Sequence, residues 1–295
     1  MIVNRGVGPA RTTKDGHSQM IPCISQVTTL STPFEADLPA FARAGWPAAE
    51  LSLTKLETFL QSHSIDDARA ILIDNGIVAA GAATQGGLLL AVGEARATHW
   101  DHFRRRLALL QSLGAKTLVI APDFEAAPRP EDFARAADSL AEAGRLAADH
   151  GVRLALEFQK TATFCASLDT ALALIAQSEA PNVGVCLDLF HYYTGPSKFE
   201  DLAYLSRENL AWVQVCDLSG TPRELAGDSD RILPGDGDFQ IGPILDHLAR
   251  VGYDGYVSLE LLNPGLWPIA AGAVADAGLR AVSRLLAGIS APGEG

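Results

Sequence analysis

Residues 183–191 read VGVCLDLFH, an apolar run that ends in Asp188 and His191. A near-continuous apolar run of this length is typical of a strand that is buried on both faces of a parallel sheet. Three nearby runs follow the same design: residues 153–159 read RLALEFQ, 212–218 read WVQVCDL and 256–263 read YVSLELLN. Each run carries polar side chains near its end, which predicts four parallel strands whose ends face a common polar site.

Four more apolar runs precede these, so the chain contains eight candidate strands. They are predicted at residues 21–27, 48–53, 77–83, 117–121, 153–158, 183–189, 212–218 and 256–262. Amphipathic stretches that suit helices lie between and after the strands, the clearest being residues 130–150, 244–251, 271–286 and a helix capped by Ser167. Eight alternating strands and helices most simply close into a (β/α)8 TIM barrel. A doubly wound open sheet is the alternative.

The length of 295 residues also fits a single barrel domain. No Pro- or Gly-rich linker divides the chain. We predict a barrel catalytic domain over residues 21–288, preceded by a flexible extension at 1–20 and followed by a tail at 289–295. One long loop, residues 219–239, follows the seventh strand, and loops of that length in a compact domain are usually functional.

The composition disfavours several classes of partner. The formal net charge is −12, whereas nucleic-acid binding needs clustered Lys and Arg, and an anionic membrane would repel this chain. No apolar run is long enough for a transmembrane helix. The cysteines stand singly without a CxxC pair, a usage typical of a reducing compartment, which favours a cytoplasmic location. They are Cys23, Cys165, Cys186 and Cys216.

Four side chains at the strand ends are candidate metal ligands. They are Glu157, Asp188, Gln214 and Glu260. In a barrel of this type the carboxyl ends of the strands meet at one face, which carries the active site. A carboxylate inside an apolar strand is costly unless a partner compensates its charge. For one carboxylate alone, a nearby Arg or a helix N-terminus would suffice, but three together favour one divalent cation. Hard oxygen ligands indicate Mn2+ or Mg2+.

These residues resemble the sugar phosphate isomerase/epimerase family with the xylose isomerase-like barrel, and the resemblance spans residues 21 to about 286. The family includes ketose 3-epimerases, hydroxypyruvate isomerase, inosose dehydratase and 3-dehydroshikimate dehydratases. Its metal ligands come from strands five to eight, so the resemblance implies the same four residues here. Gln214 stands where most epimerases carry His, as in members similar to hydroxypyruvate isomerase.

The resemblance also implies substrate-binding residues. The Asp-x-x-His pair formed by Asp188 and His191 matches the family, in which this His contacts substrate oxygens. An Arg after the third ligand often binds substrate, and Arg223 is the candidate. Glu50 matches a Glu that ends the second strand in many members. Asp217 is expected to bind substrate or to orient Arg223 or another residue of the site.

The implied activity is isomerisation or epimerisation of a small sugar or keto-polyol, with Glu157 and Glu260 as the acid/base pair. Removing a proton beside a carbonyl gives an enediolate, which a metal ion stabilises. If the enediolate expels a β-hydroxyl, the enzyme is instead a dehydratase or lyase of a keto-inositol, a 3-keto sugar or a dehydroshikimate. A non-catalytic sugar-binding subunit is a third hypothesis. A nuclease is disfavoured, because only His191 lies at a strand end. Related barrels are often homo-oligomers, so self-association is compatible with the family.

Overall fold

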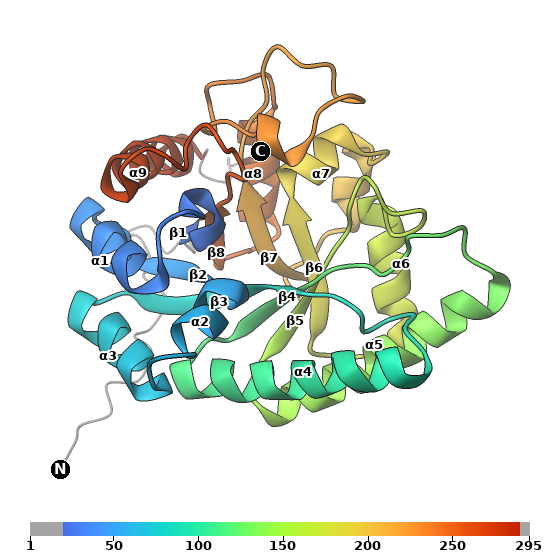
Figure 1. Ribbon diagram of the computed structural model, residues 1–295. Helices are drawn as coiled ribbons and strands as arrows, with labels where there is room; N and C mark the ends of the chain where they lie inside the picture. Colours follow the sequence, from blue (N-terminus) through green and yellow to red (C-terminus); the bar gives the residue numbers. More distant parts are fainter. Residues whose placement is uncertain (1–19, 290–295) are drawn as a thin grey trace.

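Eight parallel strands form a closed barrel, because the last strand pairs with the first. In the computed structural model, which describes residues 20–289, the strands follow one another around the barrel in sequence order (Figure 1). They are β1 (Ile21–Ser25), β2 (Ala48–Ser52), β3 (Val78–Gln85), β4 (Thr117–Ile120), β5 (Arg153–Glu157), β6 (Val183–Asp188), β7 (Leu210–Val215) and β8 (Tyr256–Leu259). The predicted (β/α)8 TIM barrel is confirmed. The direct pairing of β8 with β1 excludes an open sheet.

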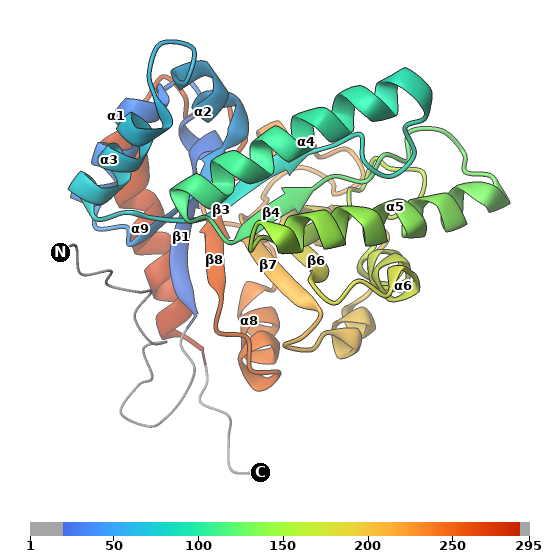
Figure 2. The same ribbon diagram turned by 90° about the horizontal axis from the view of Figure 1, so that it is seen from below.

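The helices form a ring outside the barrel, which Figure 2 shows from below. They are α1 (Phe34–Ala44), α2 (Leu53–Phe59), α3 (Ile65–Asn75), α4 (Gly93–Leu113), α5 (Pro130–Asp149), α6 (Leu168–Ser178), α7 (Leu189–Thr194), α8 (Ile241–Arg250) and α9 (Ala271–Ala287). In the described part of the chain, three short 3-10 helices lie in loops: η1 (Gln26–Thr29), η2 (Phe199–Tyr204) and η3 (Asp228–Asp230). The last helix, α9, packs beside α1 and so covers the seam where the barrel closes.

A small apolar cluster fills the barrel interior, separate from the larger core between strands and helices. It consists of Cys23, Ala48, Ala80, Ala83, Val119, Ala155, Cys186, Ala211 and Trp212, with Tyr256 against it. All but one of the buried members are small, so the Trp212 ring supplies most of the volume. Gly81 makes room for that ring, since a Cβ at this position would lie 3.0 Å from Trp212. Close packing of one large ring with small neighbours gives the site above it a firm floor.

The polar residues stand directly above this floor. Side chains alternate between the two faces of a strand, so residues two positions apart point the same way. On β5, β6 and β7, the residue two positions beyond the interior side chain is polar. These pairs are Ala155 and Glu157, Cys186 and Asp188, and Trp212 and Gln214. The alternation of side chains along each strand therefore points Glu157, Asp188 and Gln214 toward the barrel mouth.

A buried ion pair supports the loop that leaves β1. Lys55 Nζ pairs with Asp37 and donates to the carbonyl oxygens of Gln26 at 2.9 Å and Thr29 at 2.7 Å. Thr29 Oγ1 donates to Asp37 at 2.7 Å. Burial raises the pKa of the Asp37 carboxyl to about 6, against the lowering effect of Lys55. The folded protein therefore binds this proton more tightly than the unfolded chain does.

Asp37 is expected to give a distinctive dependence of stability on pH. Its contribution is fully present below about pH 4 and is lost as the pH rises through about 6, a change of about 3 kcal/mol. In Asp37→Asn this contribution is absent. Urea unfolding between pH 4 and 6.5 should show the wild type losing more free energy of unfolding than the variant. Parallel curves for the two proteins would contradict the raised pKa.

The predicted extension at 1–20 and tail at 289–295 lie almost wholly outside the described residues, so both stay predictions. Met20 begins the described chain and is buried. No helix between residues 20 and 289 combines the length and hydrophobicity needed to cross a bilayer.

Candidate metal centre and active site

Glu157, Asp188 and His191 converge at the ends of β5 and β6. Each offers one ligand atom, and these atoms all lie within 4.8 Å of one another. Asp188 ends β6 and caps α7, accepting from the backbone N–H of Phe190 at 2.6 Å and of His191 at 3.3 Å. This cap also starts the helical turn that turns His191 back toward the strand end. Within residues 20–289, a ring nitrogen of His191, Nδ1, is buried and has no hydrogen-bond partner.

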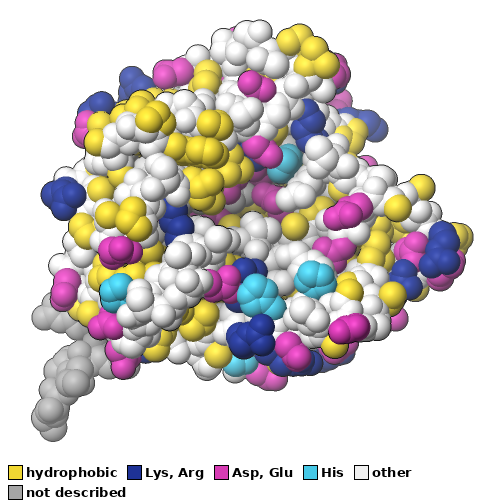
Figure 3. All heavy atoms as spheres, viewed as in Figure 1, with side chains coloured by type: hydrophobic (Ala, Val, Ile, Leu, Met, Phe, Trp, Pro, Cys, Tyr) yellow, Lys and Arg dark blue, Asp and Glu magenta, His cyan; other side chains and the backbone are white. Residues whose placement is uncertain are grey.

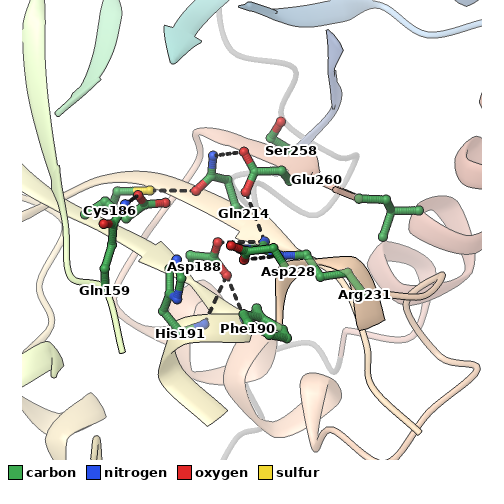
Figure 4. Close-up of polar contacts among 12 residues, drawn as sticks. Gln159, Cys186, Asp188, Phe190, His191, Gln214, Asp228, Arg231, Ser258 and Glu260 are labelled. Atoms are coloured by element: carbon green, nitrogen blue, oxygen red, sulfur yellow. Dashed lines mark hydrogen bonds and ion pairs between the residues drawn. The ribbon is translucent and has the colours of Figure 1, made fainter. Parts of the chain in front are cut away.

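Gln214 links the end of β7 to two other carboxylates. Its Nε2 donates to Glu260 Oε1 and to Glu50 Oε1, both at 2.9 Å, while its Oε1 accepts from Cys186 Sγ at 3.1 Å. Figure 4 shows the amide between Cys186 and Glu260. A half-turn of the amide would present its oxygen, in place of Nε2, to Glu260 and to Glu50, and the contact with Glu50 would then need a protonated Glu50 carboxyl.

Glu50 lies below Gln214 and is fully buried. Ser258 Oγ donates to its second carboxylate oxygen at 2.5 Å. Burial raises the pKa of Glu50 to about 7. With Gln214 and Ser258 engaging both oxygens, Glu50 is placed to hold Gln214 rather than to contact a substrate.

Arg231 reaches into the same cluster from the loop after β7. Its Nη1 lies 2.8 Å from Asp188 Oδ2 and 3.0 Å from Glu260 Oε2, and its guanidinium carbon stands 4.6 Å from the centre of the Phe190 ring. Asp228 accepts from Nη2 of the same group at 2.9 Å. The side chain is only 1% exposed. Figure 4 shows the guanidinium bridging carboxylates that come from β6 and from the end of β8.

The cluster holds more buried negative charge than Arg231 can balance. Burial raises the pKa of Glu157 to about 8, and the charge of Asp188 adds to the shift. Burial also raises the pKa of Glu260 well above its usual value, against the opposing effect of Arg231. For Asp188, Arg231 and His191 outweigh burial and hold the pKa below its usual value. Adding a divalent cation would compensate the remaining carboxylates.

The residues therefore fit a metal ion on three observations. The described cluster has an excess of buried carboxylates, it brings three donor atoms together, and it contains an unpartnered imidazole nitrogen. The structure links all four predicted ligands into one network: Asp188 lies near Glu157, and Arg231 joins Asp188 to Glu260, which Gln214 also contacts. Gln214 fits as an oxygen ligand only after the half-turn of its amide.

The side chains that reach the opening are not the deepest ones. Glu157, His191 and Glu260 are 5%, 7% and 6% exposed, whereas Asp188 is fully buried. Figure 3 shows acidic side chains within a hollow near the centre of this face, with hydrophobic side chains gathered along one side. The small exposed fractions of the two glutamates and the imidazole make them the members of this cluster that a small molecule could contact.

The structure does not bring Arg223 to this site. Its side chain is 63% exposed and pairs only loosely with Glu224, at 3.5 Å. Its carbonyl oxygen accepts from Lys160 Nζ at 3.0 Å, so its backbone supports the loop. Asp217 is fully buried and accepts backbone N–H groups of the same loop, so it does not face the opening. The arginine that lies in the site is Arg231, which sequence reasoning missed.

A sequence signal for Arg231 exists in retrospect. The residue is followed by Ile-Leu-Pro-Gly-Asp-Gly, a turn-forming stretch that folds the loop back toward the barrel. The sequence made Arg223 the candidate because it is the first arginine after Gln214, the third predicted ligand. The structure shows that the fold of the loop, rather than sequence proximity, determines which arginine enters the mouth.

Comparisons with known proteins agree with this fold. A family model described as "Xylose isomerase-like TIM barrel" matches residues 38–285. The inosose isomerase of Bacillus velezensis is 25% identical over 265 residues, which cover 84% of this chain and 91% of that protein. The 3-dehydroshikimate dehydratase of Pseudomonas aeruginosa is 27% identical over 184 residues, covering 62% of this chain but 29% of that protein. The curated relatives named here are enzymes.

Solved structures give the same fold. A crystal structure described as the IOLI protein with a bound zinc atom aligns with a TM-score of 0.86 at 23% identity, covering 92% of this chain and all of that one. A structure of L-ribulose 3-epimerase aligns with a TM-score of 0.74 at 18% identity, covering 91% and 95% of the two chains. At these identities the likeness concerns the fold.

Proposed function

The chain belongs to the xylose isomerase-like TIM barrel family, and we propose that it is a divalent-metal-dependent isomerase of a keto-inositol or a similar keto-polyol. The observation that carries the proposal is the meeting of Glu157, Asp188 and His191 at the barrel mouth, joined through Arg231 to Glu260. The resemblance inferred from the sequence is confirmed at the level of the family. The substrate and the direction of the reaction are the proposal.

Glu157, Asp188, Gln214 and Glu260 would hold the metal ion. When bound, the cation supplies positive charge to oxygens that become negative as a proton leaves the substrate. Oxygen ligands suit Mn2+ or Mg2+, and the zinc described for the related IOLI protein adds Zn2+ as a candidate.

Glu157 and Glu260 are the proposed proton-transfer groups. They come from strands three positions apart around the barrel and both reach the opening. The raised pKa of Glu157 belongs to the site without metal; a bound cation would favour the carboxylate, which is the form that takes a proton from carbon. Moving the carbonyl to the neighbouring carbon takes a proton from one carbon and returns one to the other, while a proton moves from the hydroxyl oxygen to the former carbonyl oxygen. Two groups on different sides of the substrate can perform both transfers.

Arg231 and His191 are the proposed substrate-orienting groups. Arg231 has a buried guanidinium whose Nη1 pairs with Asp188 and Glu260, so it would donate to a substrate oxygen that gains charge in place of one of these carboxylates once they bind the metal ion. His191 has an unpartnered Nδ1, and burial lowers its pKa, which favours the neutral imidazole. A neutral imidazole can donate to or accept from a hydroxyl group of a polyol.

An assay of keto-inositols tests the proposed reaction. The protein loaded with Mn2+, Mg2+ or Zn2+ is expected to convert one keto-inositol into an isomer of equal mass, which chromatography with mass spectrometry separates. The chelated protein should be inactive and should recover when metal is returned. Equal conversion by the chelated protein would contradict the proposed role of the metal.

Metal binding itself is expected to be tight and to depend on Asp188. With Mn2+ at about 100 times its Kd, the gain in free energy of unfolding is about 2.7 kcal/mol, which raises Tm by about 5 °C. Asp188→Asn should abolish the rise. Asp138→Asn, an exposed position on α5, is the matched control and should keep it. Calorimetric titration should give one ion per chain, and an unchanged rise in Asp188→Asn would place the ion elsewhere.

A dehydratase is the second candidate, and the match to the 3-dehydroshikimate dehydratase of Pseudomonas aeruginosa favours it. The same proton abstraction followed by loss of a β-hydroxyl gives a product that is lighter by one water. The assay above separates the two reactions by mass. A homo-oligomer and a cytoplasmic location stay predictions.

A further inference from the structure

The loop that delivers Arg231 is tied back to the strand from which it leaves. Asp217 N–H donates to the Ile232 carbonyl at 2.9 Å, and Ile232 N–H donates to the Asp217 carbonyl at 3.0 Å. Asn263 Nδ2 donates to the Arg231 carbonyl oxygen at 2.9 Å. The Arg231 carbonyl and the residue that follows it are therefore held by residues just beyond the ends of β7 and β8.

The carboxylate of Asp217 organises the rest of the loop. Its Oδ1 accepts from the N–H groups of Leu218 at 2.9 Å and Phe239 at 3.0 Å, and its Oδ2 accepts from those of Gly235 at 2.9 Å and Gly237 at 3.0 Å. Four backbone donors on one fully buried carboxylate make a strong, charge-assisted anchor. The chain between residues 232 and 239 closes around this single side chain.

Two glycines make this closure feasible. Gly235 has a φ of +89°, which favours glycine. At Gly237 a Cβ would overlap the Asp217 carboxylate and the Leu218 carbonyl oxygen. At the other end of the loop, Lys160 Nζ donates to the Ala226 carbonyl oxygen at 2.7 Å. Arg231 thus lies between two attachment points, and the tighter one is built on Asp217.

We infer that Asp217 is a positioning residue, which fixes the loop so that the Arg231 guanidinium stands between Asp188 and Glu260. The inference rests on the role proposed above for Arg231. Asp217 itself is fully buried, and the hydrogen bonds described for its side chain go to the loop backbone rather than to the metal ligands. Its whole effect on catalysis would therefore pass through Arg231.

Asp217→Asn tests the inference, since an amide keeps the size but replaces two acceptor lone pairs with donors that face backbone N–H groups. We expect kcat/KM to fall about 10- to 100-fold, as for a small displacement of a group that binds the reacting centre. The double variant Asp217→Asn/Arg231→Met should be no slower than Arg231→Met alone. Two independent losses that multiply would instead show that Asp217 does not act through Arg231.

Limited trypsin digestion of the folded protein gives a readout that needs no turnover. Arg223 is exposed and Arg231 is buried, so the wild type should be cut after Arg223 and resist cutting after Arg231. Asp217→Asn should become susceptible after Arg231, at a temperature where its circular dichroism is unchanged. Continued resistance after Arg231 would overturn the inference.

Two further variants keep the test decisive. Gly237→Ala would disturb the contact between Gly237 and the Asp217 carboxylate, because the added Cβ overlaps that carboxylate. If Asp217→Asn does not fold, Gly237→Ala should show the same fall in kcat/KM and the same cleavage after Arg231. Asp236→Asn removes an exposed carboxylate from the same loop and should change neither readout. If the wild type shows no keto-inositol isomerisation, the proposed function fails, while the digestion still decides whether Asp217 holds Arg231 in place.

Discussion

Glu157→Gln is expected to lower kcat by about 10³-fold or more while the barrel stays folded. The substitution keeps the size and the acceptor for Gln159 Nε2, which lies 2.6 Å from Glu157 Oε2, but it removes the group that exchanges a proton. It also removes one charged donor to the metal ion. Because burial opposes the charge of this carboxylate, the variant should unfold at an equal or higher urea concentration than the metal-free wild type.

Glu157→Gln removes both a metal ligand and a proton-transfer group, and varying the metal concentration separates these two losses. At saturating metal, a residue that only bound the ion would regain most of its activity, whereas a proton-transfer residue would not. Glu179→Gln is the matched control, because Glu179 is exposed at the C-terminus of α6, where the helix returns to the opposite end of the barrel. Glu260→Gln should behave like Glu157→Gln. Near-normal kcat in either variant at saturating metal would remove that glutamate from the proton transfer.

Arg231→Met is expected to lower kcat/KM by about 10²- to 10³-fold, the range found when one preorganised donor to a developing charge is removed. Methionine fills a similar volume against Phe190 but cannot donate to an oxygen. The variant also leaves Asp188 and Glu260 without their shared cation. We therefore expect the metal-free variant to be less stable than the metal-free wild type, and added metal to restore more of its stability.

Arg223→Met is the control for Arg231→Met, since it makes the same change at an exposed position of the same loop. It should leave kcat/KM within about 2-fold of the wild type, as expected for a surface substitution. Arg231→Lys keeps the charge but loses the planar fork, so an intermediate loss is expected. If Arg223→Met were the damaging variant, the sequence-based choice of Arg223 would be correct and the site as described would be wrong.

The barrel was predictable because its signals are local. Apolar runs such as residues 183–189 identify a buried strand without knowledge of its neighbours, and β6 was found at Val183–Asp188. Strand ends were less certain: residues 212–218 were predicted for β7, which is found at Leu210–Val215. Cys216 and Leu218 continue the apolar pattern but are buried in the loop, so hydrophobicity alone could not show where the strand stops.

The candidate site was predictable where the period of a strand fixes a side chain. Glu157, Asp188 and Gln214 each lie two positions beyond an interior residue, so their direction follows from the sequence. Glu50 likewise lies two positions beyond an interior residue, Ala48. Its contacts with Gln214 on β7 and Ser258 on β8 could not be predicted from that spacing. The position of Arg231 does not follow from strand periodicity, because this residue lies in a loop. Its position depends on contacts that Asp217 makes up to 22 residues away along the chain.

The most direct test of the account is exchange of a substrate carbon-bound hydrogen with solvent. Wild-type protein carrying one metal ion per chain is incubated with a keto-inositol in D2O, alongside protein-free and Glu157→Gln samples, and the recovered keto-inositol is analysed by NMR and mass spectrometry. The account predicts deuterium at the carbon beside the carbonyl, dependent on the metal ion and lost in Glu157→Gln. Exchange that persists in Glu157→Gln, or a metal-loaded wild type that exchanges no faster than the protein-free sample, would contradict it.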